Sequence, residues 1–270
     1  MVQHAAPDVF HRWIEPLGLA VMLVLAFLFA LLVVRRHGRA EQRRLARAER
    51  KHPFAAPGRS LAAFGTAVAA AIVFARIARE VVEDETRDLD RTVSLAIHSL
   101  DGTTIDPVMR VFTSLGSPYV VVPLIVAVVA WALRRRDYRA ALVLVAVVVM
   151  TEMLNVLLKH TFSRARPTLW DEIANLHSSY SFPSGHSMAA AASYGMMGIV
   201  VSRLAPRHQR LLLVTLPALI FMIGLSRVFL GRHWPTDVVA GFAAGGFMLL
   251  AGAITLDGLP SISEQQRASH

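Results

Sequence analysis

Long uncharged apolar runs constrain the fold of this chain more than any other feature. Residues 17–34, 111–133 and 238–256 contain no charged side chain. A run of about 18 apolar residues is long enough to cross the hydrocarbon core of a bilayer as a helix. A large soluble helical protein with buried helices is the alternative, but three such runs in one chain argue against it. We therefore expect an all-α fold, a polytopic membrane helix bundle.

Seven candidate spans follow from the apolar pattern. They cover roughly residues 13–34, 60–77, 117–133, 139–158, 186–202, 210–227 and 236–256. The span at 60–77 is the weakest, because it is short and rich in alanine. We expect three parts: an N-terminal transmembrane helix with a basic loop at 1–59, a membrane domain at 60–258, and a cytoplasmic tail at 259–270.

The distribution of charge predicts the orientation. The net charge is +9, but the basic residues flank apolar runs instead of lining one polar face, so nucleic acid is not the expected partner. The loop 35–59 carries nine basic residues against two acidic ones, which places it in the cytoplasm and the N-terminus outside. Segment 79–110, with eight acidic residues against four arginines, is then outside. The loops 159–185 and 226–235 also face out, and the C-terminus lies inside.

Three segments in those two outward loops carry the unusual polar residues. They are Lys159-His-Thr-Phe-Ser-Arg-Ala-Arg166-Pro167, then Pro183-Ser184-Gly185-His186, then Ser226-Arg227 followed by His233 and Asp237. The lysine and the arginines at 166 and 227 are cations that can hold a phosphate dianion, and arginine offers a planar fork for two oxygens. Basic residues at membrane ends more often snorkel or anchor, but here all three segments fall on one side of the membrane.

Helix starts are expected at Pro183 and Pro235, so that the residues after Pro183 occupy a first turn whose N–H groups and dipole favour an anion. An aspartate four residues after a histidine can accept its ring N–H and fix its tautomer, as Asp237 can for His233. A metal site at this pair is the alternative reading, but no further ligands are grouped with it. The chain has no cysteine, so thiolate chemistry is excluded.

These residues, as Lys159-x6-Arg166-Pro167, Pro183-Ser184-Gly185-His186 and Ser226-Arg227-x5-His233-x3-Asp237, resemble the three-part signature of the type 2 phosphatidic acid phosphatase family. The resemblance covers the chain from about residue 60 onward. It implies a six-helix phosphatase core, with the first span and basic loop as an addition. It also implies hydrolysis without a metal or other cofactor.

The resemblance further implies a role for each site residue. His233, held by Asp237, attacks phosphorus to give a phosphohistidine, and His186 protonates the leaving oxygen. The phosphate oxygens are held by Lys159, Arg166, Ser184, Gly185 and Arg227.

The expected substrate is a lipid phosphate, with undecaprenyl pyrophosphate as first choice, at the outer face of a bacterial inner membrane. Phosphatidylglycerol phosphate, phosphatidic acid and lipid A phosphates are the alternatives. A phosphotransferase with the same site, and a transporter of anionic headgroups without hydrolysis, are further readings. Apart from membrane lipids no other partner is expected, and the sequence does not indicate an oligomeric state.

Two features lie outside the signature. Glu152 and Asn155 share a helical face with Lys159, and we expect a structural role for Glu152, paired with an arginine such as Arg76 or protonated. The stretch 89–100 has apolar residues at helical spacing, which predicts an amphipathic helix on the outer surface, either a border of a lipid entrance or a plain connector.

Overall fold

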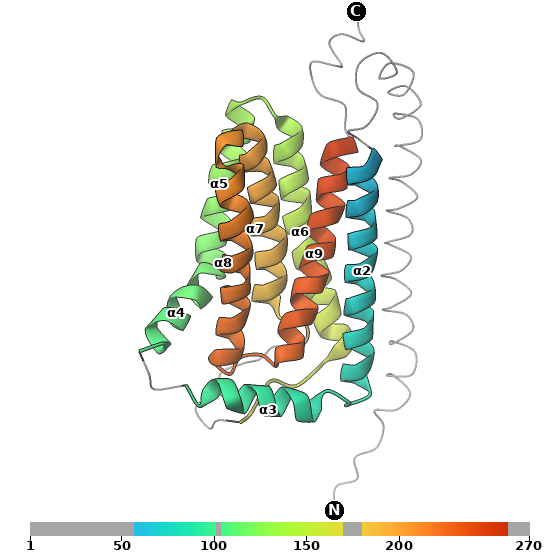
Figure 1. The fold of residues 1–270 in the computed structure, drawn as a ribbon, viewed down its shortest axis with the longest axis vertical. Coiled ribbons are helices and arrows are strands. Elements are labelled where there is room, and N and C mark those ends of the chain that lie inside the picture. Colours follow the sequence, from blue (N-terminus) through green and yellow to red (C-terminus); the bar gives the residue numbers. More distant parts are fainter. Residues whose placement is uncertain (1–56, 101–103, 170–179, 259–270) are drawn as a thin grey trace, which may run out of the picture.

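The computed structural model describes residues 57–100, 104–169 and 180–258, and within these residues all regular structure is helical. The helices, in chain order, are α2 (Pro57–Val82), α3 (Arg87–His98), α4 (Asp106–Leu115), α5 (Pro118–Arg134), α6 (Tyr138–Phe162), α7 (Gly185–Leu204), the short 3-10 helix η1 (Pro206–His208), α8 (Gln209–Phe229) and α9 (Pro235–Gly258). Figure 1 shows long helices running side by side, with α3 lying across one end.

The all-α membrane bundle expected from the sequence is confirmed. Four described helices are long and apolar enough to cross a membrane, and a fifth span arises if α4 and α5, which meet at a 45° bend, are counted as one. The weak span at 60–77 is a full helix of 26 residues, α2. The predicted span at 13–34, most of the basic loop and the tail at 259–270 lie outside the described residues.

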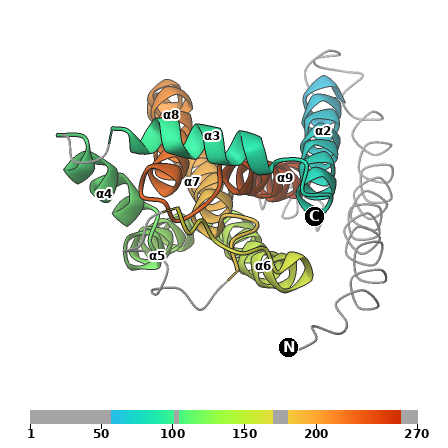
Figure 2. The same cartoon turned by 90° about the horizontal axis from the view of Figure 1, so that it is seen from below.

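Helix α7 is the centre of the bundle. Seen from the end in Figure 2, it lies among α5, α6, α8 and α9. Its Met188, Met196 and Val200 are fully buried, as are several alanines. Because α7 is buried around most of its circumference, its position is fixed by packing on every side, which suits a helix that begins at the candidate site.

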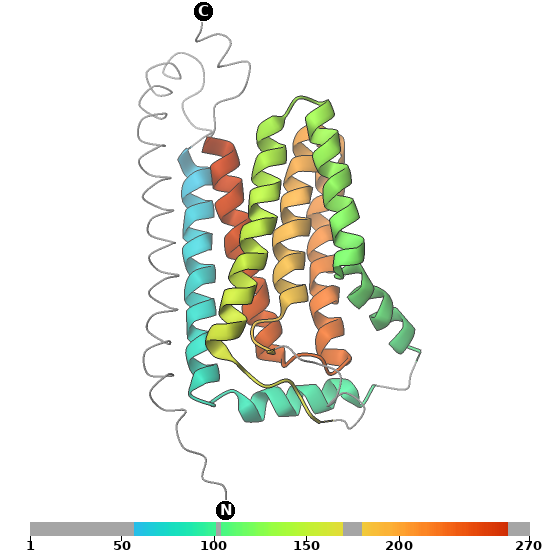
Figure 3. The same cartoon turned by 180° about the vertical axis from the view of Figure 1, so that it is seen from behind.

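Small residues allow α7 and α9 to approach closely. A Cβ atom on Gly245 would lie 2.3 Å from the carbonyl oxygen of Met188, and one on Gly241 would lie 2.7 Å from that of Ser184. Glycines four residues apart let two helix backbones meet, which is a common means of packing in membranes. On its other side α9 lies beside α2, as Figures 1 and 3 show. Helix α9 thus lies between α2 and α7.

The predicted helix at 89–100 is confirmed as α3, but the face it turns to the bundle is not the apolar one. Its buried side chains are Asp90 and Ser94, each 1% exposed, whereas Leu89 and Leu95 are 60% and 46% exposed. The polar side faces the bundle end, because Asp90 has a charged partner there, Arg164.

Candidate active site

Three chain segments meet at the end of the bundle that α3 crosses. They are the stretch that follows α6, the stretch that precedes α7, and the loop between α8 and α9 (Figure 1). The Ser181 N–H donates to the Arg164 carbonyl at 2.8 Å, and the Ser184 N–H donates to the Asp237 carbonyl at 2.9 Å. Between them Phe182 is fully buried, with its ring centroid 4.9 Å from that of Phe162. Backbone pairing and aromatic packing therefore fix these segments against one another.

The carboxylate of Asp237 is buried and fully engaged. One oxygen accepts from the Arg164 guanidinium at 2.6 Å. The other accepts from the Ser181 hydroxyl and from the Trp234 N–H at 2.9 Å, and lies 3.4 Å from His233 Nδ1. The bond back to Trp234 resembles a capping box, because Pro235 begins α9 as expected and Asp237 is its third residue. The first turn of α9 thus orients this carboxylate toward the histidine ring.

The other ring nitrogen of His233 faces positive charge. Its Nε2 lies 3.3 Å from an Arg166 nitrogen, which also donates to the Arg232 carbonyl at 2.6 Å. Burial lowers the pKa of His233 well below its ordinary value of 6.5, and the charges of Arg227 and Arg166 act in the same direction while Asp237 opposes them. His233 is therefore neutral at physiological pH, with Nδ1 toward a carboxylate and Nε2 toward cations, the state that a nucleophile requires.

The other two predicted cations, Lys159 and Arg227, lie near His233 and Asp237. Lys159 Nζ donates to the Tyr180 carbonyl at 2.6 Å, and Arg227 donates to the Thr113 hydroxyl at 2.6 Å while its Nε is buried without a partner. His186, at the start of α7, is half-buried and interacts electrostatically with Arg227, His233 and Lys159. Signature residues that are 74 positions apart in sequence thus converge on one site.

The start of α7 differs from the expectation in one respect. The helix begins at Gly185, so Pro183 lies before it, and Ser184 is its N-cap rather than part of its first turn. The Ser184 Oγ caps the helix by accepting from the Ser187 backbone N–H at 3.4 Å, and it also accepts from the Ser187 hydroxyl at 2.9 Å. A Cβ on Gly185 would lie 2.8 Å from the Asn155 amide nitrogen. Glycine at this position therefore admits the Asn155 side chain beside the helix N-terminus.

Of the two states expected for Glu152, the ion pair with Arg76 does not occur among the described residues, and the protonated state stays a prediction. The Glu152 side chain interacts with Asn155, which is 9% exposed. Because Asn155 lies beside Gly185, this pair joins the middle of α6 to the start of α7. The same described residues contain no cluster of three or more His, Asp or Glu side chains suited to a metal ion.

The sequence reading missed four residues that bond to the site. Arg164 and Ser181 each donate a hydrogen bond to Asp237. Asp90 and Thr236 are further hydrogen-bond partners of Arg164. Arg164 lies inside the first signature segment, two residues before Arg166, so its position was the available signal. Nothing in the local sequence links it to Asp90, which lies 74 residues earlier in the chain.

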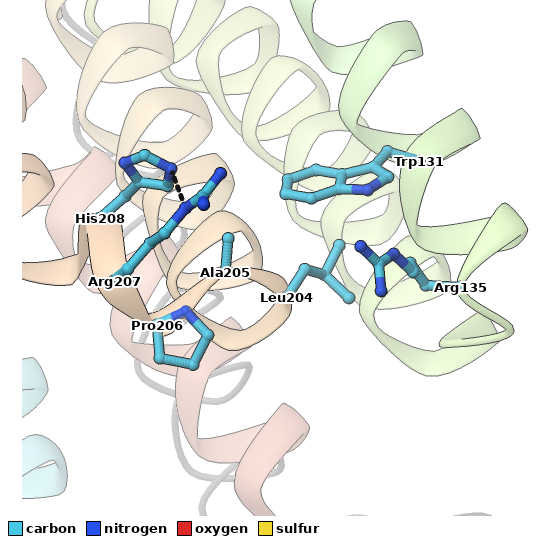
Figure 4. Close-up of a pocket in the computed structure, with 7 residues that line it drawn as sticks. All are labelled: Trp131, Arg135, Leu204, Ala205, Pro206, Arg207 and His208. Carbon is cyan, nitrogen blue, oxygen red and sulfur yellow. Dashed lines mark hydrogen bonds between the residues drawn. The ribbon is translucent and has the colours of Figure 1, made fainter.

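A separate pocket lies at the opposite end of the bundle (Figure 4). Its volume is about 370 Å³, and its lining comes from α5 and from the α7–α8 connection: Trp131, Arg135, Leu204, Ala205, Pro206, Arg207 and His208. Its one histidine accepts from the Arg207 guanidinium at 2.9 Å, and no carboxylate is present. The histidine of this pocket therefore has no carboxylate beside it, unlike His233 at the end crossed by α3.

Comparison with known proteins identifies the family of this chain. Residues 140–257 match the model of the PAP2 superfamily. A curated relative is 31% identical over 178 residues, which are 64% of this chain and 86% of that protein. The chain therefore belongs to the PAP2 superfamily, and it is a multi-pass membrane enzyme of the kind that acts on lipid phosphates or diphosphates.

The particular relatives are named for different lipids. The relative just described is phosphatidylglycerophosphatase B of Bacillus subtilis. Lipid A 1-phosphatase of Rhizobium etli is 35% identical over 40% of this chain and 46% of its own length. Undecaprenyl-diphosphatase of Sulfolobus acidocaldarius is 26% identical over 54% of this chain and 68% of its own length. The crystal structure of a transmembrane PAP2-type phosphatidylglycerolphosphate phosphatase from Bacillus subtilis superposes with a TM-score of 0.68 at 27% identity, covering 73% of this chain and 98% of that one.

Proposed function

We propose that this enzyme hydrolyses its lipid phosphate in two steps through a phosphohistidine at His233. The observation that carries the proposal is the setting of that ring, with Nδ1 beside Asp237 and Nε2 beside Arg166. In the first step Nε2 attacks phosphorus and forms an N–P bond while the bond to the leaving oxygen breaks. The carboxylate stabilises the positive charge that develops on the imidazole.

His186 supplies the proton in this scheme. It protonates the leaving lipid oxygen in the first step. In the second step it removes a proton from the water that attacks phosphorus, while the N–P bond breaks and phosphate and neutral His233 are released. The phosphoryl oxygens are held by Lys159, Arg166 and Arg227, together with the N–H groups at the start of α7. The buried Arg227 Nε without a partner supports this assignment, since a phosphate oxygen would satisfy it.

Phosphatidylglycerol phosphate becomes the first substrate to test. Phosphatidylglycerophosphatase B of Bacillus subtilis is matched over 86% of its length, and the superposed crystal structure is of a phosphatase named for the same lipid. Undecaprenyl pyrophosphate, our expectation from the sequence, is second, followed by lipid A phosphates and phosphatidic acid. The site residues read the phosphate, which all these lipids share, so the tail must be distinguished by assay.

We also propose that the site faces the outer side of a bacterial inner membrane, with residues 60–258 as the catalytic unit. The support is electrostatic. The arginines 134–136 lie in the α5–α6 connection and Arg203 and Arg207 near the α7–α8 connection, all at the bundle end opposite the site. Short basic connections favour the cytoplasm. The acidic α3 region lies at the other end.

The test is phosphate release by the purified full-length enzyme from a panel of these lipids in nanodiscs. Wild type and a His208→Ala control, which changes a histidine at the far end of the bundle, are expected to be equally active. His233→Ala is expected to lose activity at least 1,000-fold, on the order of the loss found for other covalent nucleophiles. Phosphate release by His233→Ala at the wild-type rate would exclude the mechanism. Transfer of phosphate to an added lipid alcohol in place of water would identify the phosphotransferase alternative.

A further inference from the structure

Arg164 bridges two buried carboxylates from different helices. Its Nη1 donates to Asp237 at 2.6 Å and its Nη2 donates to Asp90 at 2.7 Å, and both acids are at most 1% exposed. The same two nitrogens also donate to the hydroxyls of Thr236 and Thr86, at 2.9 and 3.2 Å. Both ends of the guanidinium fork are thus occupied, which leaves this arginine committed to the network and not to a phosphate.

Asp90 connects the network to the start of α9. Its Oδ1 accepts from the Thr236 backbone N–H at 2.9 Å, and its Oδ2 accepts from the Thr236 hydroxyl at 2.7 Å. An acidic side chain from α3 therefore satisfies a free N–H in the first turn of α9, one residue before Asp237. Trp234, which follows His233, covers the Arg164 guanidinium with its ring at 5.7 Å.

We propose that Asp90 and Arg164 are positioning residues for catalysis, and that through them the surface helix α3 holds Asp237 in register with His233. This inference rests on the function proposed above. Neither residue belongs to the signature segments' specified positions. The geometry assigns them this role because the Asp237 oxygen that bonds to Arg164 is the one that does not face His233, so this bond sets the plane of the carboxylate.

Loss of this network is therefore expected to lower kcat and to leave KM nearly unchanged. When Arg164 is lost, Asp237 keeps its donors on one oxygen only and can rotate away from Nδ1, and a displacement of about 1 Å is enough to reduce rates 100-fold. The phosphate-holding cations Lys159 and Arg166 keep their own bonds to the Tyr180 and Arg232 carbonyls, so substrate affinity is retained. A merely structural ion pair would instead reduce the amount of folded enzyme and leave the rate per folded molecule unchanged.

The experiment compares kcat and KM, per folded molecule, for Arg164→Gln, Arg164→Lys, Asp90→Asn and the Asp90→Asn/Arg164→Gln double variant. The substrate is the lipid on which the wild type is most active. The matched control is Arg87→Gln at the start of α3, which breaks an exposed pair with Asp84 in the preceding turn. We expect kcat to fall about 100-fold in Arg164→Gln with KM within threefold of wild type. Lysine lacks the planar fork whose two nitrogens each reach one of the carboxylates, so Arg164→Lys is expected to be nearly as slow.

Non-additivity identifies the network. Because Asp90 and Arg164 hold Asp237 through one shared network, the double variant is expected to lose less than the product of the two single losses, whereas independent roles would multiply them. Wild-type kcat in folded Arg164→Gln, or multiplied losses in the double variant, would overturn the inference. An inactive wild type would instead contradict the proposed function. The two failures are therefore distinguishable.

Discussion

Replacing Asp237 by asparagine keeps the size of the side chain and removes its charge. The amide nitrogen must face either Arg164, which is itself a donor, or the side where Ser181, Trp234 and His233 approach. In both orientations at least one charge-assisted hydrogen bond is lost, which is worth about 1.5–3 kcal/mol. If that loss falls on the transition state, where His233 becomes positive, kcat decreases about 10- to 150-fold, since 1.36 kcal/mol corresponds to a factor of ten.

The assay is steady-state phosphate release by Asp237→Asn in nanodiscs, with the folded fraction measured by thermal unfolding. KM is expected to remain close to the wild-type value, because the phosphate-holding cations are on the other side of the His233 ring. The matched comparison is Asp84→Asn, which changes an exposed acid in the turn between α2 and α3, outside the site, and is expected to retain full activity. A folded Asp237→Asn enzyme with kcat within threefold of wild type would refute the role given to this carboxylate.

Three further predictions concern packing, binding and pH. Gly245→Ala puts a Cβ against the Met188 carbonyl and is expected to destabilise the enzyme by about 1–3 kcal/mol, measured as a lower Tm. Gly246→Ala is the control and is expected to be neutral, because a Cβ there meets open space. Equal Tm values for the two variants would contradict the close packing of α7 and α9. Arg166→Ala is expected to raise both KM and the inhibition constant of inorganic phosphate at least tenfold, about 1.4 kcal/mol of lost binding; unchanged phosphate inhibition would remove Arg166 from the anion site. Burial holds the pKa of His233 below its ordinary 6.5, so the unfolded state binds a proton first as pH falls and the folded state loses stability from about pH 6.5 downward. The wild-type Tm is therefore expected to fall more steeply than the Tm of His233→Gln between pH 7 and 5. Parallel Tm curves for the two proteins would refute this prediction.

The helices were predictable because membrane spans depend on local composition. The predicted spans at 139–158 and 236–256 correspond to α6 and α9, with ends that differ by a few residues. The orientation of α3 was not predictable from its own pattern. Its pattern predicted a helix on the outer surface and did not indicate that Asp90 is buried, which it is because Arg164 and Thr236 lie opposite it. A charged side chain goes inside only where the fold brings a partner to it, and that partner is distant in sequence.

The candidate site, like the fold, was predictable from the sequence only in part. The signature segments marked His233, Asp237 and the cations, and the structure brings them together at one end of the bundle. The capping role of Ser184 and the start of α7 at Gly185 depended on local geometry that the preceding proline did not reveal. Arg164 resembled one more basic residue at a membrane end. Its role follows only from the two carboxylates on either side of it.

The most direct test of the central claim is to trap the phosphorylated enzyme. A ³²P-labelled aryl phosphate has a good leaving group that needs no proton from His186, so His186→Ala is expected to accumulate the intermediate. The reaction is quenched in alkali, in which a phosphohistidine is stable, and the label is located by peptide mass spectrometry. The account predicts label on His233, present in wild type, increased in His186→Ala and absent in His233→Ala. Label on another residue, or phosphate release by His233→Ala at the wild-type rate without any labelled enzyme, would contradict it.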